Sequence, residues 1–176
     1  MKMKRIQLLY AVLFVGILTL GVACSDKTNV AQKDNVENAL KQADIKGVTV
    51  SEDRDKNLIT LGGTLHSEEA KAKAGDVAKS AASSRIIANE IGIQPLGNEG
   101  DAKTIASNVD DAIEKNYKAA LIANNLKADH IRYDSKNGVL TLKGKVKTTK
   151  DRQDAQQIAS SVPNVQQVVN EIEVSR

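Results

Sequence analysis

Residues 139–144 read Val-Leu-Thr-Leu-Lys-Gly, and residues 58–63, which lie 81 positions earlier, read Leu-Ile-Thr-Leu-Gly-Gly. The same shift places Asn89-Glu90-Ile91 on Asn170-Glu171-Ile172 without a gap. A register held over this length indicates two copies of one fold of about 60 residues, a size that folds alone only marginally.

Hydrophobic periodicity predicts the same order of elements in both copies. The second copy is expected to contain a helix carrying Ile105 to Leu121, a strand around 130–133, a hairpin turn at 136–138, a strand at 139–146, a helix capped by Thr148 and a strand at 168–174. The matching segments of the first copy are 36–43, 48–52, 58–65, 67–82 and 86–93. We therefore predict an α+β protein with two tandem α-β-β-α-β domains, each a small three-stranded mixed sheet covered by two helices.

The predicted domain plan follows from composition and from the repeat. It consists of a signal peptide at 1–23, a tether at 24–33, a first domain at 34–94, a linker at 95–103 and a second domain at 104–176. The linker is predicted because Pro95, Gly97 and Asn98 lie in a stretch without apolar periodicity. We expect it to be flexible, so that the second domain can fold back towards the tether.

The N-terminus is typical of a secretory signal, with a basic start, an apolar stretch over residues 6–20 and small residues before Cys24. The apolar run is too short to favour a transmembrane helix. Cys24 is the only cysteine, so it has no disulfide partner in the chain. Leu20-Gly21-Val22-Ala23-Cys24 resembles a bacterial lipobox, which implies a diacylglyceryl-modified, palmitate-bearing Cys24 as the first mature residue. The alternative is an ordinary signal peptide with a cysteine nearby by chance.

Charge and aromatic content argue against a nucleic-acid partner. The chain has 25 Lys and Arg against 22 Asp and Glu, and Lys2, Lys4 and Arg5 account for the excess, so residues 24–176 are formally neutral. Tyr117 and Tyr133 are the aromatic residues left after residue 23, too few for a base-stacking surface.

The motifs of the second copy carry a family resemblance. It reads Gly138-Val139-x-Thr141-Leu142-x-Gly144-x-Val146 and later Val165-x-x-Val168-x-Asn170-x-Ile172-x-Val174. This pattern resembles the BON domain, named for bacterial osmotic-stress periplasmic and nodulation proteins; the first copy departs from it with Asn57 at the turn glycine. Together with the lipobox, it is similar to dual-BON lipoproteins of Gram-negative envelopes. The resemblance implies attachment to phospholipid or envelope components, stress tolerance and no catalysis.

A search for catalytic or metal-binding residues finds no candidate set. His66 and His130 are not repeated between the copies, and neither has a cysteine or a fixed carboxylate at metal-ligand spacing. Glu68-Glu69 follow Ser67, where carboxylates favour a helix start. We predict a bulge or a close backbone approach at Gly62-Gly63 and structural hydrogen bonds from Asn89 and Asn170. No enzymatic activity, metal or cofactor is therefore expected.

Two surfaces of the second copy are candidate binding sites. On the first helix, Ile122 is predicted to face solvent between Lys115 and Lys118, as an aliphatic group entering a membrane between two cations does. The alternative is an isolated surface isoleucine, which is common. The secondary candidate consists of Lys143, Lys145 and Lys147 along one side of a strand, where lysines also prevent edge pairing.

The first hypothesis is therefore a non-enzymatic, lipid-anchored protein that binds anionic phospholipid and supports envelope integrity. We expect it in the outer membrane facing the periplasm, since Ser25 fits the enterobacterial sorting rule by analogy. The rival is a periplasmic protein-interaction or chaperone-like module that uses the sheet face or the edge of the last strand. The oligomeric state is left open by the sequence.

Overall fold

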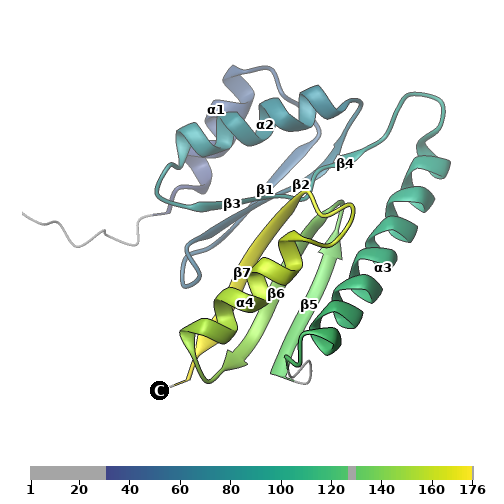
Figure 1. Cartoon of the computed structure of the whole chain (residues 1–176). Helices are drawn as coiled ribbons and strands as arrows, with labels where there is room; N and C mark the ends of the chain where they lie inside the picture. Colours follow the sequence, from purple (N-terminus) through teal and green to yellow (C-terminus); the bar gives the residue numbers. More distant parts are fainter. Residues whose placement is uncertain (1–30, 127–129, 176) are drawn as a thin grey trace, which may run out of the picture.

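The computed structural model describes residues 31–126 and 130–175, which form two units of the same element order (Figure 1). The first unit contains α1 (Lys33–Gln42), β1 (Val48–Asp53), β2 (Leu58–Leu65), α2 (Glu68–Ala81), β3 (Ile86–Asn89) and β4 (Gly92–Ile93). In its sheet, β2 is central, antiparallel to β1 and parallel to β3 and β4. The predicted last strand 86–93 is thus interrupted at Glu90 and Ile91, where Ile91 turns into the core.

The second unit contains α3 (Glu99–Ala123), β5 (Ile131–Lys136), β6 (Val139–Val146), α4 (Thr149–Ser160) and β7 (Gln167–Val174). Its central strand β6 pairs antiparallel with β5 and parallel with β7. Both units therefore confirm the predicted small mixed sheets with two helices each.

Local sequence signals account for where these elements begin and turn. The Thr148 side chain accepts from the backbone of Asp151, whose carboxylate accepts from the backbone of Thr148, so α4 begins with the predicted capping box. Asn137 (φ 49°) and Gly138 (φ 81°) form the hairpin turn between β5 and β6. Asn57 (φ 56°) serves the matching turn of the first unit, because asparagine tolerates the left-handed region.

Each unit has its own hydrophobic core between its helices and its sheet. Around Leu61, the first core contains Val36, Leu40, Val50, Ile59, Leu65, Ala74, Ala78, Ala82 and Ile91. Around Tyr117, the second contains Ile113, Leu121, Ile131, Leu140, Leu142, Val146, Ala155, Ala159, Val162 and Ile172. Neither core needs residues of the other unit.

The structure of the junction between the units differs from the expectation in two respects. Residues 99–103, assigned to the linker, form the first part of α3, so the connection is shorter than expected. Ile105, the first residue of the predicted helical hydrophobic periodicity, is 62% exposed, while the first fully buried residue of α3 is Ile113. The reason is that the N-terminal half of α3 extends past the core of its own unit towards the first unit (Figure 1).

A glycine at the same position of each copy lies close to a backbone carbonyl of the same unit. A Cβ on Gly63 would lie 2.1 Å from the Gly47 carbonyl oxygen, and one on Gly144 would lie 2.2 Å from that of His130. This confirms the predicted close approach.

The asparagines that recur in the last strands make side-chain hydrogen bonds to the helices. The Asn89 amide donates to the Lys71 carbonyl, and the Asn170 amide donates to that of Arg152. Both asparagines are therefore structural, as predicted.

The two units also pack against each other through the sheet faces that their helices leave uncovered. Leu58, Ala88, Val139 and Val169 form a separate buried cluster between the units. The 81-residue shift maps Leu58 on Val139 and Ala88 on Val169, so each unit contributes the same two positions. An interface in which equivalent patches meet has approximate twofold symmetry, as in an isologous dimer. The expected free movement at the linker is therefore wrong.

Polar contacts extend this interface on both sides of the apolar cluster. The Gln167 side chain accepts from the backbone N–H of Asn89 and donates to the carbonyl of Ile87, so it occupies part of the outer edge of β3. Lys71 Nζ donates to the Asn137 carbonyl (3.0 Å) and to Gln166 Oε1 (3.1 Å). These contacts hold the β5–β6 hairpin and the start of β7 on the first unit.

Candidate functional site

The first candidate site, Lys115, Lys118 and Ile122, lies on the outer side of α3, because the inner side of this helix packs on the sheet. Tyr117 is fully buried, its hydroxyl donates to the Ala155 carbonyl (3.2 Å), and its ring meets that of Tyr133 edge-on at 5.1 Å. Burial raises the pKa of the Tyr117 hydroxyl, so it remains a neutral donor. These contacts set the rotation of α3, and Ile122 consequently lies on the outside with 61% of its surface exposed.

The sign of charge changes along α3. Its first sixteen residues contain five carboxylates and one lysine, namely Glu99, Asp101, Asp110, Asp111, Glu114 and Lys103. The remaining nine contain Lys115 and Lys118 and no acidic residue. Both lysines are exposed, and no carboxylate of the described residues pairs with either. The basic, Ile122-bearing surface is therefore restricted to the C-terminal part of the helix.

The three lysines of the secondary candidate are exposed, but they are not equivalent. Lys143 and Lys145 lie on β6, and Lys147 follows its end. Lys145 pairs with Glu173 at 3.1 Å, with both side chains about 70% exposed, so this contact is weak and screened. Lys143 and Lys147 have no carboxylate partner within the part of the chain that the structure describes.

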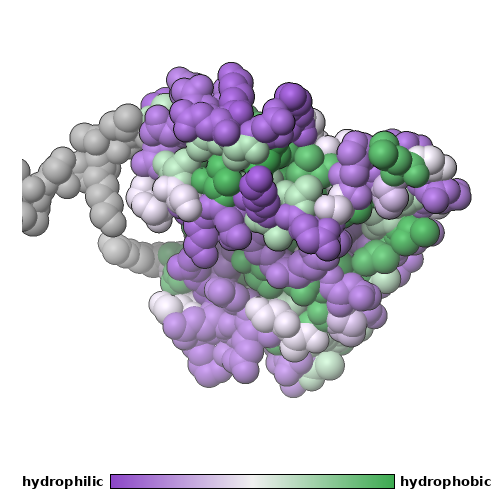
Figure 2. All heavy atoms as spheres, turned by 90° about the horizontal axis from the view of Figure 1, so that it is seen from above, coloured by the Kyte–Doolittle hydropathy of each residue, from purple (hydrophilic) through white to green (hydrophobic). Residues whose placement is uncertain are grey.

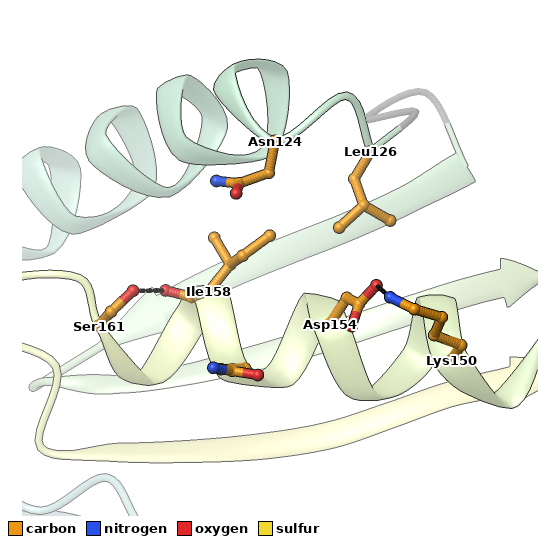
Figure 3. Close-up of a pocket in the computed structure, with 7 residues that line it drawn as sticks. Asn124, Leu126, Lys150, Asp154, Ile158 and Ser161 are labelled. Atoms are coloured by element: carbon orange, nitrogen blue, oxygen red, sulfur yellow. Dashed lines mark hydrogen bonds and ion pairs between the residues drawn. The ribbon is translucent and has the colours of Figure 1, made fainter.

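Two of the strand lysines lie beside the segment that follows α3, at the end of the second unit that is distant from the first. A groove of about 570 Å³ there is lined on one side by Asn124, Leu126 and His130, and on the other by Lys145 and Lys147. A neighbouring groove of about 420 Å³ separates the end of α3 from α4, where Leu126 and Ile158 face each other and Lys150 is paired with Asp154 (Figure 3). Sequence reasoning treated these surfaces as separate alternatives.

The uncovered sheet face that the rival hypothesis requires is only partly available. Val139 and Thr141 on β6 and Val169 on β7 are buried, although α3 and α4 pack on the other face of this sheet. The first unit covers this part of the face. Sequence reasoning missed the interface, yet a signal existed: Val139-Leu140 and Leu58-Ile59 are adjacent apolar pairs, which indicate a strand buried on both faces.

A third surface, not expected from the sequence, lies at the junction of the units. A groove of about 480 Å³ runs between α2, β4 and the N-terminal half of α3. Its apolar lining consists of Ile91, Ile93, Pro95, Ala102, Ile105, Ala106, Val109 and Val165. Seen from above, hydrophobic atoms gather on the side where the linker and the start of α3 lie (Figure 2). Leu96 is 75% exposed there.

The histidines take no part in a catalytic or metal site of the described residues. His66 Nδ1 contacts the Gln94 carbonyl (2.9 Å) and His130 is exposed. Over residues 31–126 and 130–175, no group of three or more His, Cys, Asp or Glu is placed to hold a metal. Ser67 caps α2 as expected, and backbone and Ser67 hydrogen bonds lower the pKa of the Glu69 carboxyl.

The predicted lipidation site, Cys24, lies outside the described residues. Among the helices that are described, none is both long enough and apolar enough to cross a bilayer.

With this architecture established, comparison with known proteins identifies the family. The BON domain matches residues 28–95 and again residues 109–176. The chain belongs to the BON-domain family and carries two copies of the domain in tandem, as the sequence motifs predict.

A characterised relative is Osmotically-inducible protein Y of Escherichia coli (strain K12), which is 28% identical over 129 residues. The alignment covers 73% of this chain and 63% of the relative, so the chain spans less than two thirds of the relative's length.

Two solved structures of CdsD, a structural protein of the type III secretion system of Chlamydia trachomatis, also align. The first, of the C-terminal domain, has a TM-score of 0.34 at 15% identity and covers 80% of this chain and 63% of the other. The second has a TM-score of 0.35 at 11% identity and covers 81% and 91%. At such TM-scores the likeness carries no argument about function.

Proposed function

We propose that this protein is a non-enzymatic, lipid-anchored envelope protein that binds anionic phospholipid through the C-terminal part of α3. The observation that carries the proposal is Ile122, a large aliphatic side chain that is 61% exposed on the same helix segment as Lys115 and Lys118, which have no carboxylate partner among the described residues. In this arrangement Ile122 enters the acyl boundary while the two ammonium groups contact headgroup phosphates.

The charge distribution supports this orientation. A lysine near an anionic membrane surface contributes about 1 kcal/mol, and burying an isoleucine contributes about 1.5–3 kcal/mol. The acidic N-terminal half of α3 is repelled by the same surface. The helix therefore approaches the bilayer with its C-terminal end, beyond which Asn124 and Leu126 share a groove with Lys145 and Lys147.

Anchoring is proposed to come from Cys24, with acyl chains that make attachment stable without α3. The tether from residue 25 to residue 33 spans at most about 30 Å, so the folded part stays close to the membrane. Because the two units pack together, the second unit reaches the bilayer by rotation of the whole body on the tether. Even weak headgroup contacts gain from the resulting high effective concentration.

A role in osmotic-stress tolerance at the periplasmic side of the envelope is proposed from the BON family and from the similarity to Osmotically-inducible protein Y. A protein-interaction role is the alternative. It is favoured by the apolar groove at the junction, where Leu96 and Ile105 remain exposed beside Ile93 and Val109.

Sedimentation with liposomes tests the proposal. Protein lacking residues 1–24 retains every described element and should sediment with vesicles containing phosphatidylglycerol or cardiolipin, but not with pure phosphatidylcholine. Added salt should release it, since exposed charges are screened over about 10 Å at 0.1 M. Indifference to anionic lipid, with recovery of one specific envelope protein by crosslinking, favours the alternative.

A further inference from the structure

The outer face of α3 carries a second pattern that lipid binding does not require. Six exposed residues recur at alternating intervals of three and four, namely Ile105, Asn108, Ala112, Lys115, Ala119 and Ile122. This spacing is the heptad repeat, which keeps one stripe of a helix in contact with a neighbouring helix. No residue of this chain within 31–126 and 130–175 buries the stripe, since all six remain exposed.

The stripe has an isoleucine at each end, and Asn108, Ala112, Lys115 and Ala119 lie between them. Ile105 and Ile122 are 62% and 61% exposed and lie 17 residues apart, or about 26 Å along the helix axis. Ala112 and Ala119 leave room for a second helix to approach closely. Two such helices in antiparallel orientation place Ile105 of one against Ile122 of the other at both ends.

The charge distribution along α3 favours a second copy of the chain as the partner of this stripe, and it favours an antiparallel orientation of the two helices. The N-terminal half of α3 is acidic and its C-terminal part is basic, so a parallel pair aligns like charges along its length. In the antiparallel pair, Asp111 of one copy lies near Lys118 of the other, and symmetry makes this contact twice. The surface is therefore complementary to itself, which is the condition for a closed twofold interface.

We propose that two copies of this protein dimerise through antiparallel contact of their α3 helices, with Ile105 packed against Ile122 and Asp111 beside Lys118 at both ends. The contact covers Ile122, so a chain in the dimer cannot insert this residue into a bilayer. Dimerisation and the proposed lipid binding thus use overlapping surfaces, but the dimer does not depend on lipid. Anchoring in one membrane raises the local concentration of both copies.

Directed disulfide formation tests the orientation. The protein lacking residues 1–24 contains no cysteine, so single cysteines can be introduced at Ile105 and at Ile122. The antiparallel contact predicts that a mixture of Ile105→Cys and Ile122→Cys forms the mixed disulfide much faster than either protein links to itself, since bridging needs Cα atoms within about 7 Å. In the control, a protein with Lys41→Cys, an exposed position on α1, is mixed with the Ile122→Cys protein. The rate of this disulfide measures linking by random collision.

Sedimentation equilibrium tests the contact energetically without lipid. Ile105→Asp should weaken the dimer at least about tenfold, because two aliphatic contacts are lost per dimer. Leu96→Asp, which changes an exposed aliphatic residue outside the stripe, should leave it unchanged. Asp111→Lys and Lys118→Asp should each weaken the dimer, and the double variant should restore it.

These measurements separate this proposal from the lipid proposal. A protein that stays monomeric up to millimolar concentration, self-linking that is faster than the mixed disulfide, or no rescue in the double variant overturns the dimer. Ile105→Asp lies outside the lipid patch and should still sediment with anionic liposomes. If the protein dimerises normally but does not bind anionic liposomes, the proposed function is wrong and the dimer inference still holds.

Discussion

Glu90 and Glu171 occupy the same position of the two copies, and each is ion-paired with a lysine from the β-hairpin of the opposite copy. Glu171 Oε2 lies 2.6 Å from Lys56 Nζ, and Glu90 Oε2 lies 3.1 Å from Lys136 Nζ. The glutamates are equivalent under the 81-residue shift, whereas the lysines are not, since Lys56 maps on Asn137. A tandem BON chain can thus behave as an internal dimer with a defined orientation of its units.

Opening this interface should separate the units without unfolding them. Val169 is 1% exposed in the cluster between the units, and Val169→Asp buries an unpaired charge there, which costs several kcal/mol unless the interface opens. Because each unit has its own core, we expect an increased radius of gyration in X-ray scattering with unchanged circular dichroism. Glu173→Ala, at an exposed position of the same strand, is the control. An unchanged scattering profile, or loss of secondary structure, contradicts the interpretation.

Lys71 should make stability depend on pH in the alkaline range. Burial lowers the pKa of its ammonium group, and Glu68 and Asp110 only partly oppose this. The unfolded chain keeps the proton up to about pH 10.4, so it binds more protons than the folded chain between the lowered pKa and that value. The free energy of unfolding therefore gains a contribution that rises with pH in this window.

Urea unfolding at several pH values between about 8 and 10 checks this expectation. Lys71→Met keeps the apolar stem and should abolish the rise, whereas Lys79→Met, at an exposed site of the same helix, should retain it. Identical pH profiles for Lys71→Met and the unmodified protein exclude this role of Lys71.

The two candidate lipid surfaces can be ranked in one liposome titration. Ile122→Asp should abolish association, because it removes the inserted group and places a negative charge against phosphate. Replacement of Lys143, Lys145 and Lys147 by Gln should matter less, although it could cost up to about 3 kcal/mol if these lysines form the site. Thermal unfolding of both variants serves as the folding control. If Ile122→Asp does not change liposome association and the lysine replacements reduce it strongly, the lipid-binding site lies on β6 instead.

Lipidation of Cys24 is tested on protein extracted from membranes. Intact-mass analysis should show a chain that starts at residue 24 and carries a mass consistent with diacylglyceryl modification. Cys24→Ser should release the chain from the membrane or block its processing. A wild-type product that is soluble and begins at another residue is incompatible with the proposed anchor.

Gly144 should tolerate no side chain. Its φ is 122°, and a Cβ would lie 2.2 Å from the His130 carbonyl oxygen, so Gly144→Ala requires the backbone of β5 or β6 to move. We expect a loss of about 1–3 kcal/mol in urea unfolding. Gly100→Ala in α3 meets nothing within 4 Å and should be neutral or stabilising. Equal effects of the two substitutions would show that the close approach is not rigid.

The sequence by itself determined the repeat, the order of elements and most of each core. Strand alternation around Leu140 and Leu142, the cap at Thr148 and the turn at Asn137 depend on residues close together in the chain, so local patterns predict them correctly. The solvent exposure expected for Ile122 follows in the same way, from helical periodicity within one segment.

Only the tertiary structure decided what lies against the second face of each sheet. Leu58 and Val139 are apolar residues beside predicted core positions, and nothing local states that they meet each other. The contacts of Gln167 with Ile87 and of Lys71 with Asn137 join residues 80 and 66 positions apart. Such contacts arise from the relative placement of the units, which also takes Ile105 off its own core. A hydrophobic period shows which face of an element is apolar, but what covers that face depends on the rest of the molecule.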